Sequence, residues 1–257
     1  RDLLWMFVRR DIVTNYKQTI LGPLWFFIQP ALTTAMFVFI QRAAKIDTDG
    51  IHPVLFYLIG VTAWNYFAEC LTKTSTTFKD NAFIFGKVYF PRLILPLSIV
   101  VSNLIRFFIQ LLLFVIITVL FIALGKTKIN IQITVLFFPL LVLIMAGLGL
   151  GAGLIITSMT TKYRDLALLV QFGVQLLMYA TTVIYPLSTA ITKYPKYAWI
   201  IKYNPMTPIL ETFRFGFLGE GTFSWESLGY VSLITLIILV FGIVIFNKVE
   251  RNFVDTV

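Results

Sequence analysis

Six long apolar runs, separated by short polar segments, restrict what this sequence can fold into. They cover residues 23–41, 53–71, 98–124, 131–157, 166–186 and 226–246. A helix crosses the ~30 Å hydrocarbon layer of a membrane with about 20 apolar residues, because each residue adds ~1.5 Å. The sequence therefore predicts an all-α integral membrane protein, with six transmembrane helices in one domain over residues 1–257.

The composition excludes an ordinary soluble domain. Hydrophobic residues make up 58% of the chain and charged residues 13%, whereas soluble domains are roughly 45–50% apolar and about 25% charged. Too few polar residues remain to cover a water-exposed surface. The net charge of +9 would suit nucleic acid. Its basic residues lie between the apolar runs, however, so lipid headgroups explain them better and we expect no nucleic-acid partner.

The positions of the basic residues predict the orientation. With an even number of spans, both termini lie on the same side of the membrane. If the N-terminus is cytoplasmic, twelve Lys and Arg residues fall in inner segments and eight in outer ones. Inner segments of membrane proteins are enriched in Lys and Arg, so we expect both termini to be cytoplasmic.

Two segments are expected to lie at the membrane without crossing it. In residues 1–21, Leu4, Val8, Ile12 and Tyr16 recur every fourth residue. This spacing predicts an amphipathic interfacial helix with its apolar face toward the acyl chains. Residues 187–225 are apolar but interrupted by prolines, which predicts two short helices that re-enter the outer side.

Two further patterns predict local structure. The polar, basic segment 72–92 contains a short helix candidate at 80–89, with Asp80 as its N-cap and Pro91 after its end. Within the fourth apolar run, glycines alternate from Gly147 to Gly153. Overlapping G-x-x-x-G spacings allow helix backbones to approach closely, so this run is expected to be a packing surface.

The sequence lacks the residues of an enzyme or a metal centre. It has one cysteine, Cys70, and one histidine, His52, so we expect no disulfide, no metal site and no catalytic residue. Gly125-Lys126-Thr127 imitates the end of a nucleotide-binding loop, but Leu120 occupies the position of its first glycine. If ATP drives this protein, another chain must bind it.

One pair of opposite charges lies within the apolar runs. Glu69 falls near the inner end of the second run, and Arg106 falls early in the third. Antiparallel neighbouring helices would bring them together as an intramembrane ion pair, which we favour over a proton relay because buried relays use more groups.

Several short motifs, in order along nearly the whole chain, resemble one transporter family. The opening segment, from Arg10-Asp11 through Tyr16–Gly22 to Gln29-Pro30, resembles the permeases of ABC-2 type polysaccharide exporters, and its O-antigen branch most closely. The later matching motifs are Phe90-Pro91-Arg92, Leu95-Pro96-Leu97, Tyr163-Arg164-Asp165-Leu166 and Asn204-Pro205-Met206 with Glu211 and Arg214.

The resemblance implies a function, partners and roles for specific residues. It implies export of lipid-linked polysaccharide across the bacterial inner membrane by two permease copies and two ATPase subunits, which bind ATP and Mg. Residues 80–89 would be the coupling helix that docks on the ATPase; a solvated, positively charged loop is the alternative. Residues 187–225 would be outer gate helices. The implied coupling residues are Asp80, Asn81, Phe83, Phe85, Lys87, Tyr163, Arg164 and Asp165, and the implied gate residues are Asn204, Pro205, Glu211 and Arg214.

A channel for sugar chains needs aromatic faces and a few hydrogen-bonding groups, because strong charges would retain the polymer. The first and fifth runs offer such residues, and lipid contact or helix packing is the alternative for each aromatic. The candidates are Trp25, Phe26, Phe27, Tyr179 and Tyr185, with Gln171 and Gln175 as polar groups.

Other functions remain open at this point. An ABC-2 exporter of a lipid, a drug, teichoic acid or capsule polymer would share the architecture and differ in its substrate. An ion-coupled carrier would need more buried ionisable groups than these runs contain.

Overall fold

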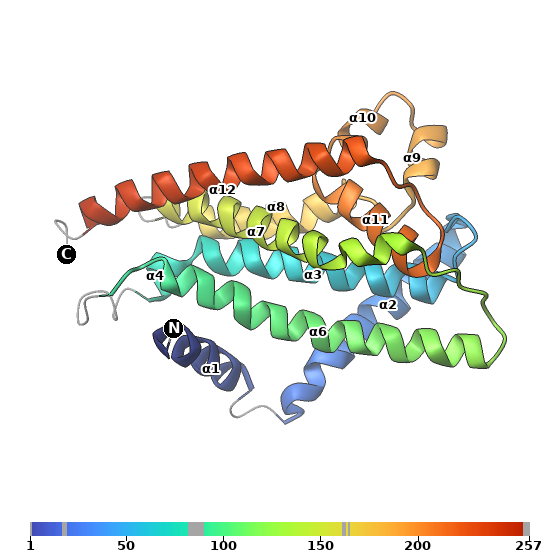
Figure 1. The fold of residues 1–257 in the computed structure, drawn as a ribbon, viewed down its shortest axis with the longest axis horizontal. Coiled ribbons are helices and arrows are strands. Elements are labelled where there is room, and N and C mark those ends of the chain that lie inside the picture. Colours follow the sequence, from blue (N-terminus) through green and yellow to red (C-terminus); the bar gives the residue numbers. More distant parts are fainter. Residues whose placement is uncertain (1, 17–19, 82–89, 161–162, 164, 254–257) are drawn as a thin grey trace.

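The computed structural model describes residues 2–16, 20–81, 90–160, 163 and 165–253, and every regular element in them is a helix (Figure 1). In chain order these are α1 Asp2–Tyr16, η1 Gly22–Leu24, α2 Trp25–Ala44, α3 Pro53–Ser75, α4 Thr77–Asp80, α6 Ile94–Ala123, η2 Ile133–Phe137, α7 Phe138–Thr160, α8 Leu166–Tyr179, α9 Leu187–Lys193, α10 Ala198–Lys202, α11 Met206–Leu218 and α12 Trp225–Phe253.

Five of the six expected spans correspond to helices that are long and apolar enough to cross a membrane. These are Gly22–Ala44, Pro53–Ser75, Ile94–Ala123, Ile133–Thr160 and Trp225–Val249. The expected span 166–186 is different, because its helix α8 has only 14 residues and ends at Tyr179. At ~1.5 Å per residue, α8 is about 21 Å long, which is shorter than the ~30 Å hydrocarbon layer.

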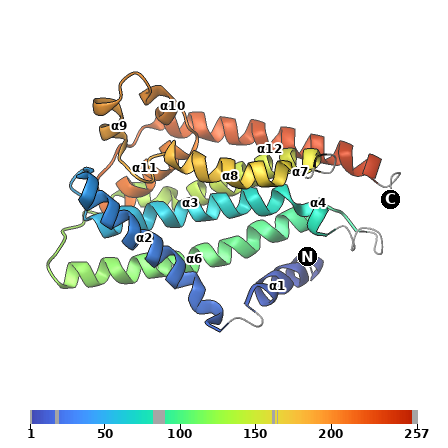
Figure 2. The same ribbon diagram turned by 180° about the vertical axis from the view of Figure 1, so that it is seen from behind.

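The chain runs back and forth along the long axis of the molecule. Helices α2, α3, α6, α7, α8 and α12 follow this axis in alternating directions (Figure 1). As a result, α1 and the last turns of α12 lie at one end, and α9, α10 and α11 lie at the other, as the reverse view also shows (Figure 2). Two short helices were expected in residues 187–225, and the structure has three there, α9, α10 and α11.

Helix α3 forms the centre of the bundle. Of its most apolar stretch, 78% is buried, compared with 17–39% for the other four long helices. Its aromatic residues Phe56, Tyr57 and Trp64 are almost fully buried. The membrane-like character of the chain is therefore carried by the outer helices, while α3 is enclosed by protein.

The glycines of α7 pack against two different neighbours. A Cβ at Gly149 or Gly153 would come within 2.8 Å or 2.5 Å of side-chain atoms of Cys70 or Thr74 in α3. A Cβ at Gly151 would come within 2.7 Å of the Leu239 backbone in α12. Alternate glycines thus face opposite helices, and both neighbours touch the α7 backbone, as the G-x-x-x-G spacing predicted.

Helix α1 lies beside the start of α6 (Figures 1 and 2), but the face it buries differs from the expectation. Phe7 and Val8 are 5% and 1% exposed, and Phe7 packs in a small cluster with Phe90 and Leu95. Val8 was expected to face acyl chains and instead faces the bundle. Trp5, Met6 and Val13 are exposed and are available to lipid.

The α7 contacts predict that Gly151→Ala destabilises the chain. Overpacking in a close-packed interior costs about 1–3 kcal/mol, and here the obstacle is backbone, which cannot move aside as a flexible side chain can. Gly229→Ala in α12 is the matched control, since nothing lies within 4 Å of its added Cβ. Thermal unfolding in detergent measures both, and equal unfolding midpoints for the two variants would contradict the prediction.

Candidate functional site

The chain leaves helical geometry after α8 while still inside the bundle. Thr181, Thr182 and Val183 show no measurable exposure, although residues 180–186 form turns and bends. Buried carbonyls without helical partners need other donors, because leaving them unpaired costs free energy. The donors that pair with these carbonyls therefore decide which segments pack together at this end of the molecule.

Three side chains from three other segments donate hydrogen bonds to these carbonyls. Asn204 Nδ2 lies 3.0 Å from the Ala180 oxygen, and the Tyr57 hydroxyl lies 3.0 Å from the Ile184 oxygen. Arg214 Nη2 lies 3.3 Å from the Val183 oxygen. The irregular segment is therefore held by α3, by α11 and by the residues just before α11.

Arg214 is charged and fully enclosed, with 1% of its surface exposed. Its Nη1 donates to Glu211 Oε1 at 3.2 Å, and its guanidinium lies 3.6 Å from the centre of the Phe56 ring. A Cβ at Gly60 would come within 3.1 Å of Nη2, so the glycine in α3 makes room for the guanidinium. Ion pairing and the aromatic face together offset the loss of water around the cation.

Three of the four residues expected in an outer gate, Asn204, Glu211 and Arg214, thus make internal contacts within this chain. Glu211 is 2% exposed and also accepts hydrogen bonds from the backbone and hydroxyl of Thr222. Asn204 caps the start of α11 by accepting from the Met206 N–H, and Pro205 immediately precedes this helix. The gate assignment of Asn204, Pro205, Glu211 and Arg214 stays a prediction, and within this chain Asn204, Glu211 and Arg214 hold α11 in place.

The exposed face of α8 is partly polar. Val174 is its only buried residue, and Gln171 and Gln175 are exposed alongside Phe172 and Tyr179. The Tyr185 hydroxyl donates to the Tyr179 carbonyl at 2.6 Å and closes the end of this helix. The face therefore offers amide groups next to aromatic rings.

The exposed faces of α6 and α12 are different in kind. Their middle turns present branched aliphatic and aromatic side chains, which is what contact with acyl chains requires. Those residues are Leu112, Val115, Ile116, Val119 and Leu120 in α6, and Leu236, Ile237, Val240, Phe241 and Val244 in α12.

The aromatic residues expected to line a channel from α2 divide into two groups. Trp25 is 45% exposed and Phe27 is half-buried. Phe26 is 7% exposed and lies under the Arg106 guanidinium, 5.6 Å from it. Within this chain the Phe26 ring therefore packs inside, and its channel assignment stays a prediction.

Glu69 and Arg106 form the ion pair that the sequence predicted. Arg106 Nη1 lies 2.6 Å from Glu69 Oε2, and Lys73 Nζ lies 3.0 Å from the same oxygen. Sequence reasoning missed Lys73, although its spacing of four residues from Glu69 on one helix is the signal for such a pair. Two cations therefore share one carboxylate near the end of α3.

The expected coupling residues are only partly described. Asp80 ends α4, and its carboxylate accepts a hydrogen bond from Thr76 at 2.6 Å. Asn81 accepts one from Arg10 of α1 at 3.3 Å. Tyr163 is 54% exposed and Asp165 directly precedes α8. Phe83, Phe85, Lys87 and Arg164 lie outside the described residues, as does most of the helix expected at 80–89.

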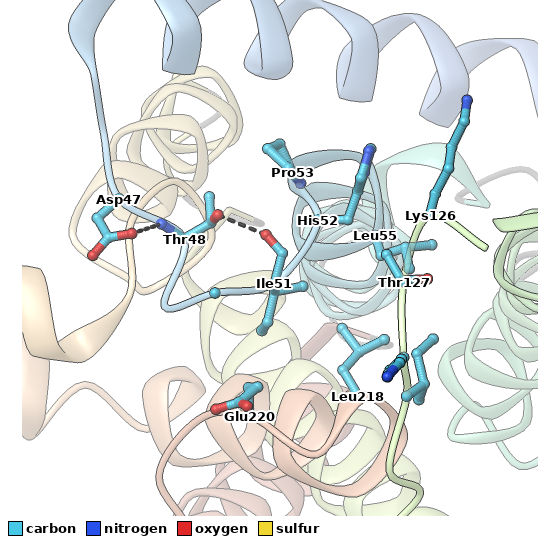
Figure 3. Close-up of a pocket in the computed structure, with 13 residues that line it drawn as sticks. Asp47, Thr48, Ile51, His52, Pro53, Leu55, Lys126, Thr127, Leu218 and Glu220 are labelled. Carbon is cyan, nitrogen blue, oxygen red and sulfur yellow. Dashed lines mark hydrogen bonds between the residues drawn. The ribbon is translucent and has the colours of Figure 1, made fainter. Parts of the chain in front are cut away.

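At the opposite end, three loops surround a cavity of about 460 Å³. The loop before α3 and the loop after α6 lie on two sides of it, with Leu218 and Glu220 completing the wall (Figure 3). His52 caps α3 by accepting from the Val54 N–H. Burial lowers the pKa of His52, and the charges of Lys126 and Arg42 lower it further, so the neutral, capping form is favoured. The described residues contain no group of three or more His, Cys, Asp or Glu side chains that could hold a metal.

The buried contacts of Arg214 predict a large loss of stability in Arg214→Met. Removing one partner of a buried ion pair costs about 3–5 kcal/mol, because the other charge stays buried. Tyr57→Phe, which removes one neutral hydrogen bond, is expected to cost about 1 kcal/mol. Arg42→Met, at an exposed position, is the control. Thermal unfolding in detergent ranks the three variants, and an Arg214→Met midpoint equal to that of Arg42→Met would refute this reading.

Comparison with known proteins places this architecture in a family. The model of the ABC-2 type transporter family matches residues 2–218. An O-antigen export system permease protein, RfbA of Klebsiella pneumoniae, is 29% identical over 99% of this chain and 94% of its own. RfbA of Myxococcus xanthus is 27% identical over 100% of this chain and 96% of its own. A capsule polysaccharide export inner-membrane protein, CtrC of Neisseria meningitidis serogroup B, is 24% identical over 98% of this chain and 92% of its own. The chain belongs to the ABC-2 type transporter family.

Proposed function

We propose that this chain is the permease subunit of an ATP-driven exporter that moves lipid-linked polysaccharide, O-antigen in the first instance, across the bacterial inner membrane. The relatives named as O-antigen export permeases support this substrate, because they match over nearly the full length of both chains. Beyond membership of the family, we propose that transport is export, that ATP drives it and that the polymer passes along α8.

The two amides on the exposed, otherwise mainly apolar face of α8 are the observation that carries the proposed path. Amide groups such as Gln171 and Gln175 are costly against hydrocarbon, because lipid offers them no hydrogen-bond partner. The faces of α6 and α12 avoid this cost by exposing apolar residues in their middle turns. Helix α8 therefore faces a second copy of the chain across a channel, where hydroxyl-rich sugars pair with the amides and stack on Tyr179.

In the proposed topology the chain crosses the membrane six times with both termini in the cytoplasm. Helix α8 and the irregular segment 180–186 together make the fifth crossing. Irregular backbone is tolerated at membrane depth where protein surrounds it, and the donors from Asn204, Tyr57 and Arg214 provide that environment. Helices α9, α10 and α11 then lie on the outer side.

Two ATPase subunits, which bind ATP and Mg, would dock on the cytoplasmic end. Segment 80–89 and the turn before α8 are the proposed contacts, because α4, which ends at Asp80, and the start of α8 lie at the end that also holds α1 and the last turns of α12 (Figure 1). The hydrogen bond from Arg10 to Asn81 links α1 to the start of this segment. A movement of the docked ATPase would then be transmitted through segment 80–89 to α1 and α3 together.

Capsule polymer is the second candidate substrate. It is favoured by the similarity to a capsule polysaccharide export protein, which is 24% identical. Both candidates are lipid-linked polymers of sugars in this proposal, so they share the requirement for amides and aromatic rings along the path. Purified lipid-linked glycan from the native host separates them.

The exporter assignment predicts that this chain, tagged and co-expressed with its genomic neighbours, copurifies with a nucleotide-binding ATPase. ATPase activity should rise when lipid-linked glycan is added. Phe83→Ala with Phe85→Ala should abolish copurification, while Lys126→Ala with Lys128→Ala, in the loop after α6, should leave it intact. A chain that purifies alone, with no ATPase among its neighbours, would overturn the proposal.

The channel assignment predicts that Gln175→Cys reacts with a charged, membrane-impermeant thiol reagent added to both sides. Leu236→Cys in α12 is the matched control, because it is 58% exposed but faces lipid in this proposal. Background labelling is low since Cys70, the only native cysteine, is fully buried. Mass shift of the purified chain measures the reaction, and equal labelling of the two variants would reject a water-filled path along α8.

A further inference from the structure

A second cavity, of about 610 Å³, lies between α1 and the bundle. One face of α1, the first turns of α6 and the end of α3 and α4 surround it. Its lining residues are Arg10, Asp11, Thr14, Lys73, Asp80, Asn81, Ile99, Ser102, Asn103 and Arg106. From this cavity we propose that the chain carries a binding site for the headgroup of a zwitterionic phospholipid, with a phosphate and an ammonium group, in the leaflet occupied by α1.

The depth of the cavity matches the headgroup layer. A hydrocarbon crossing takes about 20 residues of helix. Counted from the start of α3 at Pro53, that length ends at Lys73, and counted back from the end of α6 at Ala123 it ends at Asn103. Helix α1 exposes Trp5 and Met6, and its residues line the cavity together with Lys73 and Asn103. The cavity therefore lies where phosphate groups of a bilayer are found.

Lys73 and Arg106 provide the phosphate end of the site. Both contact Glu69 Oε2, at 3.0 Å and 2.6 Å, so two cations lie beside one carboxylate at the cavity wall. An ammonium group has three N–H donors, and among the described residues Lys73 donates to Glu69. Charge-assisted hydrogen bonds to phosphate are the natural use of the remaining donors.

Asp80 provides the ammonium end. Its Oδ2 accepts from Thr76 at 2.6 Å, and the carboxylate is exposed toward the cavity mouth, which leaves its other oxygen able to accept. Arg10 and Asp11 pair with each other at 2.8 Å and add both signs of charge to the wall. Among the described residues of the wall, with Glu69 behind it, three cations and three carboxylates balance, which suits a headgroup of no net charge better than an anionic one.

The test uses the purified full-length chain, delipidated in detergent and titrated with phosphatidylethanolamine or phosphatidylglycerol. Native mass spectrometry counts the bound lipid. We expect phosphatidylethanolamine to bind about tenfold more tightly, because its ammonium group can pair with Asp80. A tenfold difference corresponds to ~1.4 kcal/mol of binding free energy. Lys73→Gln should weaken both lipids about tenfold, and Asp80→Asn should remove the preference by weakening phosphatidylethanolamine alone.

Matched controls separate the site from general surface charge. Lys79→Gln and Asp2→Asn alter exposed residues that do not line the cavity, and both should bind as the wild type does. Unfolding midpoints of the variants are measured in the same detergent, so that weakened binding is read only from folded protein.

Three outcomes would overturn the proposal. The first is equal binding of the two lipids, unaffected by Asp80→Asn. The second is displacement of the lipid by inorganic phosphate, which would assign the site to a free anion. The third is displacement by an equimolar polyprenyl phosphate, which would assign it to a transported lipid carrier. The proposal concerns a resident lipid and holds or fails independently of the exported polymer.

Discussion

The structure depends on how the chain satisfies backbone carbonyls where α8 stops being a helix. Water cannot supply donors deep in the bundle, so each carbonyl of the irregular segment must find a protein partner. Asn204, Tyr57 and Arg214 provide them from three different segments. The buried charge of Arg214 in turn explains Glu211, the Phe56 ring and the space left by Gly60. One break in a helix thus accounts for a connected set of otherwise unexplained residues.

Much of the fold could be predicted because the signal was length and hydropathy. Five apolar runs become long helices within a few residues of the expected bounds. The run at 166–186 misled because apolar residues continue past Tyr179, whereas the helix does not. Hydropathy reports burial, and the irregular segment 180–186 is as buried as a helix would be. The carbonyls beyond Tyr179 are paired by distant donors, which no local pattern reveals.

The candidate site was predicted less well, and for a related reason. The ion pair of Glu69 and Arg106 followed from two opposite charges in neighbouring helices. The resemblance implies that Glu211 and Arg214 are gate residues, and within this chain they pair with each other in the interior. In α11, 11 of 13 residues are buried, so this helix has no polar face and its charges turn inward. A sequence does not tell which side of an apolar helix meets protein, so the burial of Phe26 beside Arg106 could not be predicted.

The bare contact of α7 with its two neighbours has a mechanical consequence. Where side chains separate two helices, the gap can widen or narrow as rotamers change. Gly149 and Gly153 on one side and Gly151 on the other leave no such cushion, since backbone meets backbone or the first side-chain carbon. The distances from α7 to α3 and to α12 are therefore fixed, and the three helices form one rigid unit. A shape change that preserves these contacts therefore moves the other helices around α3, α7 and α12 as one unit.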